Sequence, residues 1–118
     1  MLKNTYEIGK FYEKKCTTFL TKKGYQIETT NYRSLYGEID IIAKKNKELF
    51  FIEVKSYKNP SPYILYKLTK QKKEKILSTA LDYIEKKNIN DYQINFMYMI
   101  VSKNNIVYYE NVITMEII

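Results

Sequence analysis

The chain has 118 residues, a formal net charge of +7, one cysteine and no histidine. This length suits one domain with a modest core. The lack of histidine excludes Ser-His-Asp triads and nucleases that use a histidine base, and the lone Cys16 excludes an intrachain disulfide and a cysteine-rich zinc site. An enzyme of this composition must use carboxylates, lysine, tyrosine or a hard metal ion. The positive charge favours nucleic acid as a partner, although an AT-rich genome would give the same lysine bias without one.

The first half of the sequence predicts one helix followed by three strands. Apolar residues recur at helical spacing over residues 5–22, and Gly24 follows where a helix end favours a left-handed residue. Residues 25–32 alternate apolar and polar side chains, which is typical of a strand. Two further strands are predicted at 38–43 and 48–56, joined by a short polar turn.

The second half predicts a loop, a helix and a strand pair. Residues 59–62 contain two prolines and predict the loop, and residues 66–87 carry an apolar stripe at helical spacing with a cationic first half. Residues 92–101 and 105–110 predict a strand pair, and residues 112–118 a short strand or helix. The α-β-β-β-α-β-β order predicts a single α/β domain over residues 1–118, with a central mixed β-sheet flanked by helices.

The sequence also bears on where the protein is found. No stretch reaches the ~18 apolar residues that a membrane span needs. The first ten residues, MLKNTYEIGK, contain no apolar signal region. We therefore expect a cytoplasmic protein that does not contact the membrane.

The two central strands carry four charged residues among their apolar ones. Because side chains alternate between faces, Glu38 and Asp40 share one face of the first strand, and Glu53 and Lys55 share one face of the second. A turn centred between positions 46 and 47 places Asp40 opposite Glu53 and Glu38 opposite Lys55. Directly opposed side chains have Cβ atoms about 4.5–5.5 Å apart. The sequence therefore predicts one patch that gathers all four charges.

A divalent cation would explain this patch. Two carboxylates at that distance repel each other, so Asp40 and Glu53 are unfavourable neighbours on their own. Mg²⁺ binds one or two carboxylates together with water and substrate phosphate, lowers the pKa of its water and stabilises charge on a phosphate. Lys55 would then orient the attacking water or hold a phosphate oxygen. The alternative is a surface ion-pair patch in which Lys55 neutralises Glu38 and Glu53.

The motif on these strands is similar to that of a known nuclease superfamily. Asp40 followed by Glu53-Val54-Lys55 resembles the PD-(D/E)xK motif. More closely, GEIDIIA at 37–43 and FIEVK in the next strand resemble the bacterial YraN-type family, which is similar to archaeal Holliday-junction resolvases. The resemblance extends from Gly9 to about residue 95 and implies a restriction-endonuclease-like fold.

The resemblance also implies a role for the first helix. Residues 9–13 match the family's Gly-x-x-Gly-Glu pattern, except that Tyr12 replaces the second glycine. Glu13 is thereby implied to point toward the metal site and, with the carbonyl of Val54, to assist the two strand carboxylates. A solvated helix glutamate is the alternative.

Further matches concern contacts with the substrate. Residues 31–33, Asn-Tyr-Arg, and 70–71, Lys-Gln, match family patterns, whereas Gln-Ile-Asn at 93–95 replaces the family's Arg-Phe-Asp. A solvated helix face is an equally good explanation for the residues of the second helix. We predict that the nucleic-acid backbone is contacted by cationic and polar side chains, namely Arg33, Lys58, Lys70, Gln71 and Lys72.

These patterns together predict a metal-dependent endonuclease that hydrolyses phosphodiester bonds in DNA, with possible selectivity for junctions or flaps. The catalytic residues would be Asp40, Glu53, Lys55 and Glu13, with Glu38 in support and Mg²⁺ or Mn²⁺ as cofactor. A resolvase-like activity implies a homodimer, since two nicks need two sites. The alternative is a catalytically inactive DNA-binding or scaffolding module of the same fold.

Overall fold

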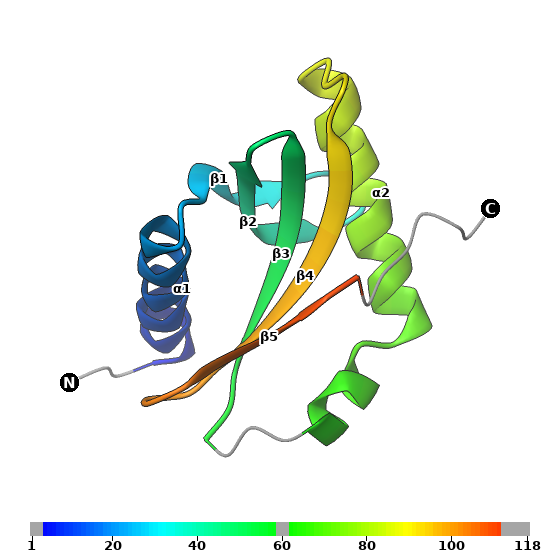
Figure 1. The fold of residues 1–118 in the computed structure, drawn as a ribbon. Helices are drawn as coiled ribbons and strands as arrows, with labels where there is room; N and C mark the ends of the chain where they lie inside the picture. Colours follow the sequence, from blue (N-terminus) through cyan, green and yellow to red (C-terminus); the bar gives the residue numbers. More distant parts are fainter. Residues whose placement is uncertain (1–3, 59–61, 112–118) are drawn as a thin grey trace.

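The computed structural model describes residues 4–58 and 62–111 (Figure 1). Most of the loop predicted at 59–62, and the element predicted at 112–118, lie outside the described residues. The helices and strands are α1 (Thr5–Lys22), β1 (Gln26–Arg33), β2 (Glu38–Lys45), β3 (Glu48–Ser56), the 3₁₀ helix η1 (Pro62–Lys67), α2 (Lys70–Lys86), β4 (Gln93–Val101) and β5 (Ile106–Glu110).

The strands form one five-stranded sheet in the order β1-β2-β3-β4-β5. The β3–β4 pair is parallel and the other pairs are antiparallel. Since parallel neighbours need a long crossover, η1 and α2 together form the connection between β3 and β4. Figure 1 shows α1 and α2 on opposite sides of the sheet. The predicted α/β fold, with a mixed sheet flanked by helices, is confirmed.

The first helix begins and ends as its sequence predicts. The side chain of Asn4 caps α1 by accepting a hydrogen bond from the Glu7 N–H at 2.8 Å. After the helix, Gly24 adopts φ +92°, which a side chain would strain, and the Tyr25 N–H donates to the Leu20 carbonyl at 3.0 Å. These contacts turn the chain back along the sheet as β1.

The second helix begins later than predicted. Residues 66–87 were expected as one α-helix, but residues 62–67 form η1 and the α-helix begins at Lys70. Thr69 is the reason, because its backbone is extended and its hydroxyl caps α2 by accepting from the Lys72 N–H at 3.2 Å. Among the described residues, no helix is long and apolar enough to span a membrane.

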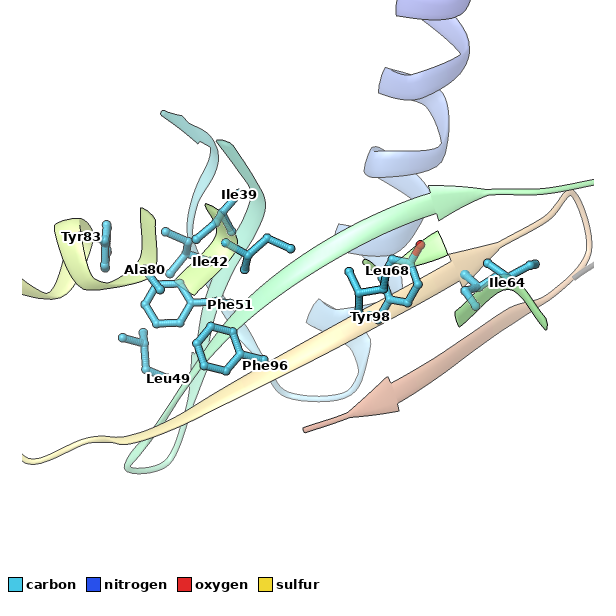
Figure 2. Close-up of a cluster of buried hydrophobic side chains, with 12 residues drawn as sticks. Ile39, Ile42, Leu49, Phe51, Ile64, Leu68, Ala80, Tyr83, Phe96 and Tyr98 are labelled. Atoms are coloured by element: carbon cyan, nitrogen blue, oxygen red, sulfur yellow. The ribbon is translucent and has the colours of Figure 1, made fainter. Parts of the chain in front are cut away.

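A hydrophobic core lies on each side of the sheet. On one side, Phe51 and Phe96 of the sheet pack with Ala80 and Tyr83 of α2, as Figure 2 shows. On the other side, Cys16 and Leu20 of α1 pack against a second set of sheet residues, which includes Ile41, Ala43, Phe50, Ile52, Met97 and Met99. The sheet is thus covered on both faces, and a functional site must lie at an end or edge of these layers.

Candidate active site at the fork between β2 and β3

The predicted β2–β3 register is confirmed over five residue pairs, and the pairing then stops. It runs from Lys45↔Glu48 to Ile41↔Ile52. Beyond this point β2 remains paired with β1, and β3 remains paired with β4 as far as Ser56. The sheet therefore opens into a fork, and the next residue on each arm is a carboxylate, Asp40 on β2 and Glu53 on β3.

Asp40 bridges the two arms of this fork. Its Oδ2 atom accepts a hydrogen bond from the Val54 N–H at 2.8 Å, which replaces a strand-to-strand backbone bond. The N–H and C=O of one strand residue point to the same edge of the strand. We therefore infer that the Val54 carbonyl also faces the fork, where the sequence predicts a ligand for a cation.

The regular alternation of β2 is interrupted at the same place. Strict alternation would place Ile39 and Ile41 on one face of the strand, but Ile39 packs in the α2 core and Ile41 in the α1 core. The alternation therefore breaks between these two residues, at Asp40. A position of this kind lets a carboxylate reach the partner strand across the gap.

Glu53 is the most strongly perturbed acid in the fork. The pKa of Glu53 is raised to about 9, chiefly by burial and then by a hydrogen bond with Asp40 and the charge of Asp40, while the charge of Lys55 acts in the opposite direction. At neutral pH the Glu53 carboxyl group therefore holds a proton in the metal-free protein. The structure thus brings the predicted carboxylate pair together.

The other two charges do not lie as the sequence suggests. Lys55 is exposed at the end of β3, close enough to Glu53 for its charge to lower the Glu53 pKa. Glu38 was expected opposite Lys55. It instead lies opposite Arg33 of β1, whose Nε is 3.6 Å from the Glu38 carboxylate. The reason is that β2 has already separated from β3 before it reaches Glu38.

A cleft of about 340 Å³ opens between the first half of α1 and the fork. Asp40 and Val54 line it from the fork, Glu13 lines it from α1, and Arg33 and Glu38 line its β1–β2 side. Glu13, which the family resemblance implies points toward the metal site, therefore lines the same cleft as Asp40. Glu53 and Lys55 do not line this cleft, because they alternate along β3 with Val54 and Ser56, which do.

Glu13 already has partners in the cleft. Its Oε2 accepts a hydrogen bond from the Asn31 side-chain amide at 2.9 Å, and its Oε1 lies 3.5 Å from the Lys10 ammonium. Lys10 also donates to the Asn31 side-chain oxygen. Sequence reasoning missed this triad, although Asn31 belongs to the matched Asn-Tyr-Arg pattern and adopts φ +52°.

The donor set suits a hard ion that keeps much of its own water. In residues 4–58 and 62–111, no three His, Cys, Asp or Glu side chains are gathered closely enough to hold a metal ion by themselves. Two adjoining carboxyl groups and an inferred carbonyl remain, with Glu13 nearby. Mg²⁺ is commonly bound by one or two carboxylates and completed by water and phosphate, so this donor set fits Mg²⁺ or Mn²⁺.

Two buried side chains, Cys16 and Tyr98, lie close enough to the fork for its acids to affect their pKa values. Burial, and next the charge of Asp40, raises the pKa of the Cys16 thiol to about 12. Burial also raises the pKa of Tyr98 to about 12, with smaller contributions from Tyr57, Glu53 and Asp40. Tyr98 is itself a core residue, and its proximity to both acids gave no signal in the sequence.

The predicted nucleic-acid contacts are divided between two places. Arg33, with 80% of its side chain exposed, lines the cleft. Lys58 and the first-turn residues of α2, namely Lys70, Gln71 and Lys72, are exposed but do not line it. The first turn of α2 contains no acidic residue, so its lysines add to the positive end of the helix dipole.

Comparison with known proteins assigns the chain to a family. Residues 12–105 match the model of the uncharacterised protein family UPF0102. This chain belongs to that family. It is 48% identical to a UPF0102 protein of Fusobacterium nucleatum subsp. nucleatum over 94 residues, which cover 79% of both chains. It is 38% identical to a UPF0102 protein of Sulfurihydrogenibium sp. over 109 residues, which cover 92% of this chain and 95% of the relative.

UPF0102 is the YraN-type family that the GEID and EVK motifs predicted, so this prediction is confirmed. The relation to PD-(D/E)xK nucleases and to Holliday-junction resolvases stays a prediction. A solved structure titled "Crystal structure of SSO0001" aligns with 15% identity and a TM-score of 0.45, covering 90% of this chain and 50% of that chain. The functional argument for this UPF0102 protein therefore rests on its own residues.

Proposed function

We propose that this UPF0102 protein is a metal-dependent endonuclease that hydrolyses phosphodiester bonds in DNA. The observation that carries the proposal is the carboxyl pair of Asp40 and Glu53 at the fork, with Lys55 on the same arm as Glu53. These two acids are half-buried, and their proximity is costly for folding because it raises the pKa of Glu53. Perturbed acids of this kind concentrate at functional sites.

Each group in the fork has a role in this proposal. Asp40, Glu53 and the Val54 carbonyl would hold Mg²⁺ or Mn²⁺, with Glu13 assisting from α1. The bound ion would lower the pKa of a water molecule and stabilise charge on the phosphate. The Val54 N–H fixes the orientation of the Asp40 carboxylate, because it occupies Oδ2.

Lys55 and the cationic side chains act on the substrate in this account. The Lys55 ammonium would orient the attacking water or hold a phosphate oxygen. Arg33 lines the cleft and would contact the DNA backbone there, and its ion pair with Glu38 sets its position. The lysines of α2 would hold the backbone farther out, so binding should weaken with salt and depend little on sequence.

The proton on Glu53 links metal binding to pH. Because Glu53 holds a proton at neutral pH, an ion that binds its carboxylate must displace that proton. The affinity for Mg²⁺ or Mn²⁺ should therefore rise as the pH increases toward 9. Binding should also release protons into the buffer.

A second candidate is a catalytically inactive DNA-binding or scaffolding module of the same fold. The Asn31 and Lys10 contacts of Glu13 favour it, since both carboxylate oxygens of Glu13 already have partners within the protein. This module would still bind DNA through its lysines. It would have no need for a deprotonated Asp40–Glu53 pair.

Calorimetric titration of Mn²⁺ separates these candidates. Wild-type protein should bind Mn²⁺, and the Asp40→Asn variant should bind it at least about tenfold more weakly. The control is Glu28→Gln, which removes an acid of β1 that pairs with Lys44, and it should bind Mn²⁺ as wild type does. Absence of wild-type binding, even with DNA present, would leave only the inactive module. Equal binding by wild type and Asp40→Asn would refute the assigned site.

The substrate and assembly are part of the same proposal. Selectivity for junctions or flaps and a homodimer would follow from a resolvase-like activity, since paired nicks need two sites. Sedimentation with and without a four-way junction measures the assembly. A monomer in both conditions would argue against paired cleavage but leave single-strand nicking intact.

A further inference from the structure

Two tyrosines on η1 form an exposed aromatic stack. Tyr63 and Tyr66 are 76% and 80% exposed, and their rings lie 6.1 Å apart between centroids with an interplanar angle of 26°. A 3₁₀ helix has three residues per turn, so side chains three apart lie in one row. The helix type therefore aligns these two rings one above the other.

The stack is held on an anchored element. On the other side of η1, Ile64 is 6% exposed, and Leu68, just after the helix, is also 6% exposed; Figure 2 shows both beside Tyr98 of β4. Burial of these two residues fixes η1 against the sheet while the tyrosine rings face outward. Most other ring pairs in the described residues meet edge to face or tilted, and several of those lie in the core.

The chain around this stack is cationic. Residues 54–73 contain six lysines and no aspartate or glutamate. Lys67 ends η1, and Lys70 and Lys72 are exposed in the first turn of α2. A binding partner for this surface must therefore combine flat apolar faces with negative charge.

We propose that Tyr63 and Tyr66 are a stacking platform for unpaired bases of a nucleic-acid strand, whose phosphates contact Lys67, Lys70 and Lys72. Every base has a π-face that stacks on an aromatic ring, and positive side chains track the backbone in single-strand binding proteins. In an intact duplex these faces are covered by neighbouring pairs, so only unpaired or terminal bases can use the platform. The nucleic-acid partner is taken from the proposed function, and the platform adds to it a binding preference for DNA with a single-stranded segment over an intact duplex.

Fluorescence anisotropy without divalent metal tests the platform apart from catalysis. Labelled oligothymidylate and a duplex of equal length are titrated with wild-type protein, the Tyr63→Ala/Tyr66→Ala variant and the Tyr63→Phe/Tyr66→Phe variant. Because stacking on one ring is worth roughly 5- to 150-fold in affinity, the alanine pair should weaken single-strand binding about tenfold or more. The alanine pair should change duplex binding less than about threefold, and the phenylalanine pair, which keeps both rings, should bind like wild type.

Three results would overturn the platform. The first is single-strand binding by the alanine pair that is unchanged while its melting temperature is also unaltered. The second is an equal loss of affinity for the single strand and the duplex in the alanine pair. The third is wild-type affinity for the single strand that is no higher than for the duplex. If the alanine pair melts at a lower temperature than wild type, its binding loss could come from misfolding. The platform is then judged by two other results: whether the phenylalanine pair binds like wild type, and whether wild type binds the single strand more tightly than the duplex. If one of these results overturns the platform, the nuclease proposal is tested separately. Metal-dependent cleavage of duplex DNA by the alanine pair would support it.

Discussion

The raised pKa of Glu53 should make the stability of the metal-free protein depend on pH. The pKa of Glu53 is raised from its ordinary value of 4.5 to about 9, so between these limits the folded protein keeps a proton that the unfolded chain releases. Stability from this group is fully present below pH 4.5 and is lost as the pH rises through about 9. The Glu53→Gln substitution removes the titration and should remove this loss.

The magnitude follows from one proton per molecule. Linkage gives a slope of up to about 1.4 kcal/mol per pH unit, so the free energy of unfolding should fall by up to roughly 3 kcal/mol between pH 6 and pH 8. Few other groups titrate in this range, because the chain has no histidine and the pKa of Cys16 is raised to about 12. The slope can therefore be assigned to the fork.

Urea denaturation in the presence of EDTA at several pH values measures this slope. Wild type and the Glu28→Gln control should lose stability as the pH rises, and Glu53→Gln should change much less. Added Mn²⁺ should flatten the wild-type slope, since an ion replaces the proton. Equal slopes in wild type and Glu53→Gln would refute the raised pKa of Glu53.

One chemical treatment and three substitutions test other parts of the account. The buried, high-pKa thiol of Cys16 should react with a thiol reagent only after unfolding, and rapid labelling of the native protein would contradict the packing of α1 on the sheet. Gly9 lies within α1 with open space around its missing Cβ, so Gly9→Ala should raise the free energy of unfolding by about 0.5–1 kcal/mol in a chemical melt; a loss would mean that α1 is packed differently. Lys70→Ala and Lys72→Ala should each reduce the salt dependence of DNA binding by about one unit of the log–log slope, and an unchanged slope would remove α2 from the interface.

The sequence was most informative where geometry is local. The β2–β3 register followed from a two-residue turn and the period of two along a strand, and Asn46 in that turn adopts the left-handed φ of +58° that such turns require. The bounds of α1 followed from its apolar stripe and from its cap and terminal glycine. These signals lie within a few residues of each other.

The parts that sequence reasoning missed depend on contacts between distant segments. The fork arises because β1 and β4 each retain one strand after β2 and β3 separate, and no pattern within β2 shows this. The Asn31 contact of Glu13 joins residues 18 positions apart. The pKa of Glu53 depends on burial, which tertiary packing alone determines.

Cleavage of labelled DNA by wild type and Asp40→Asn is the most direct test of the central claim. The account predicts that wild type cleaves a four-way junction or a duplex only with Mg²⁺ or Mn²⁺ present. It predicts that Asp40→Asn abolishes cleavage while its DNA affinity stays within a few-fold of wild type. Equal cleavage by the two proteins, or cleavage by wild type in EDTA, would contradict the assignment of the fork as a metal-dependent nuclease site.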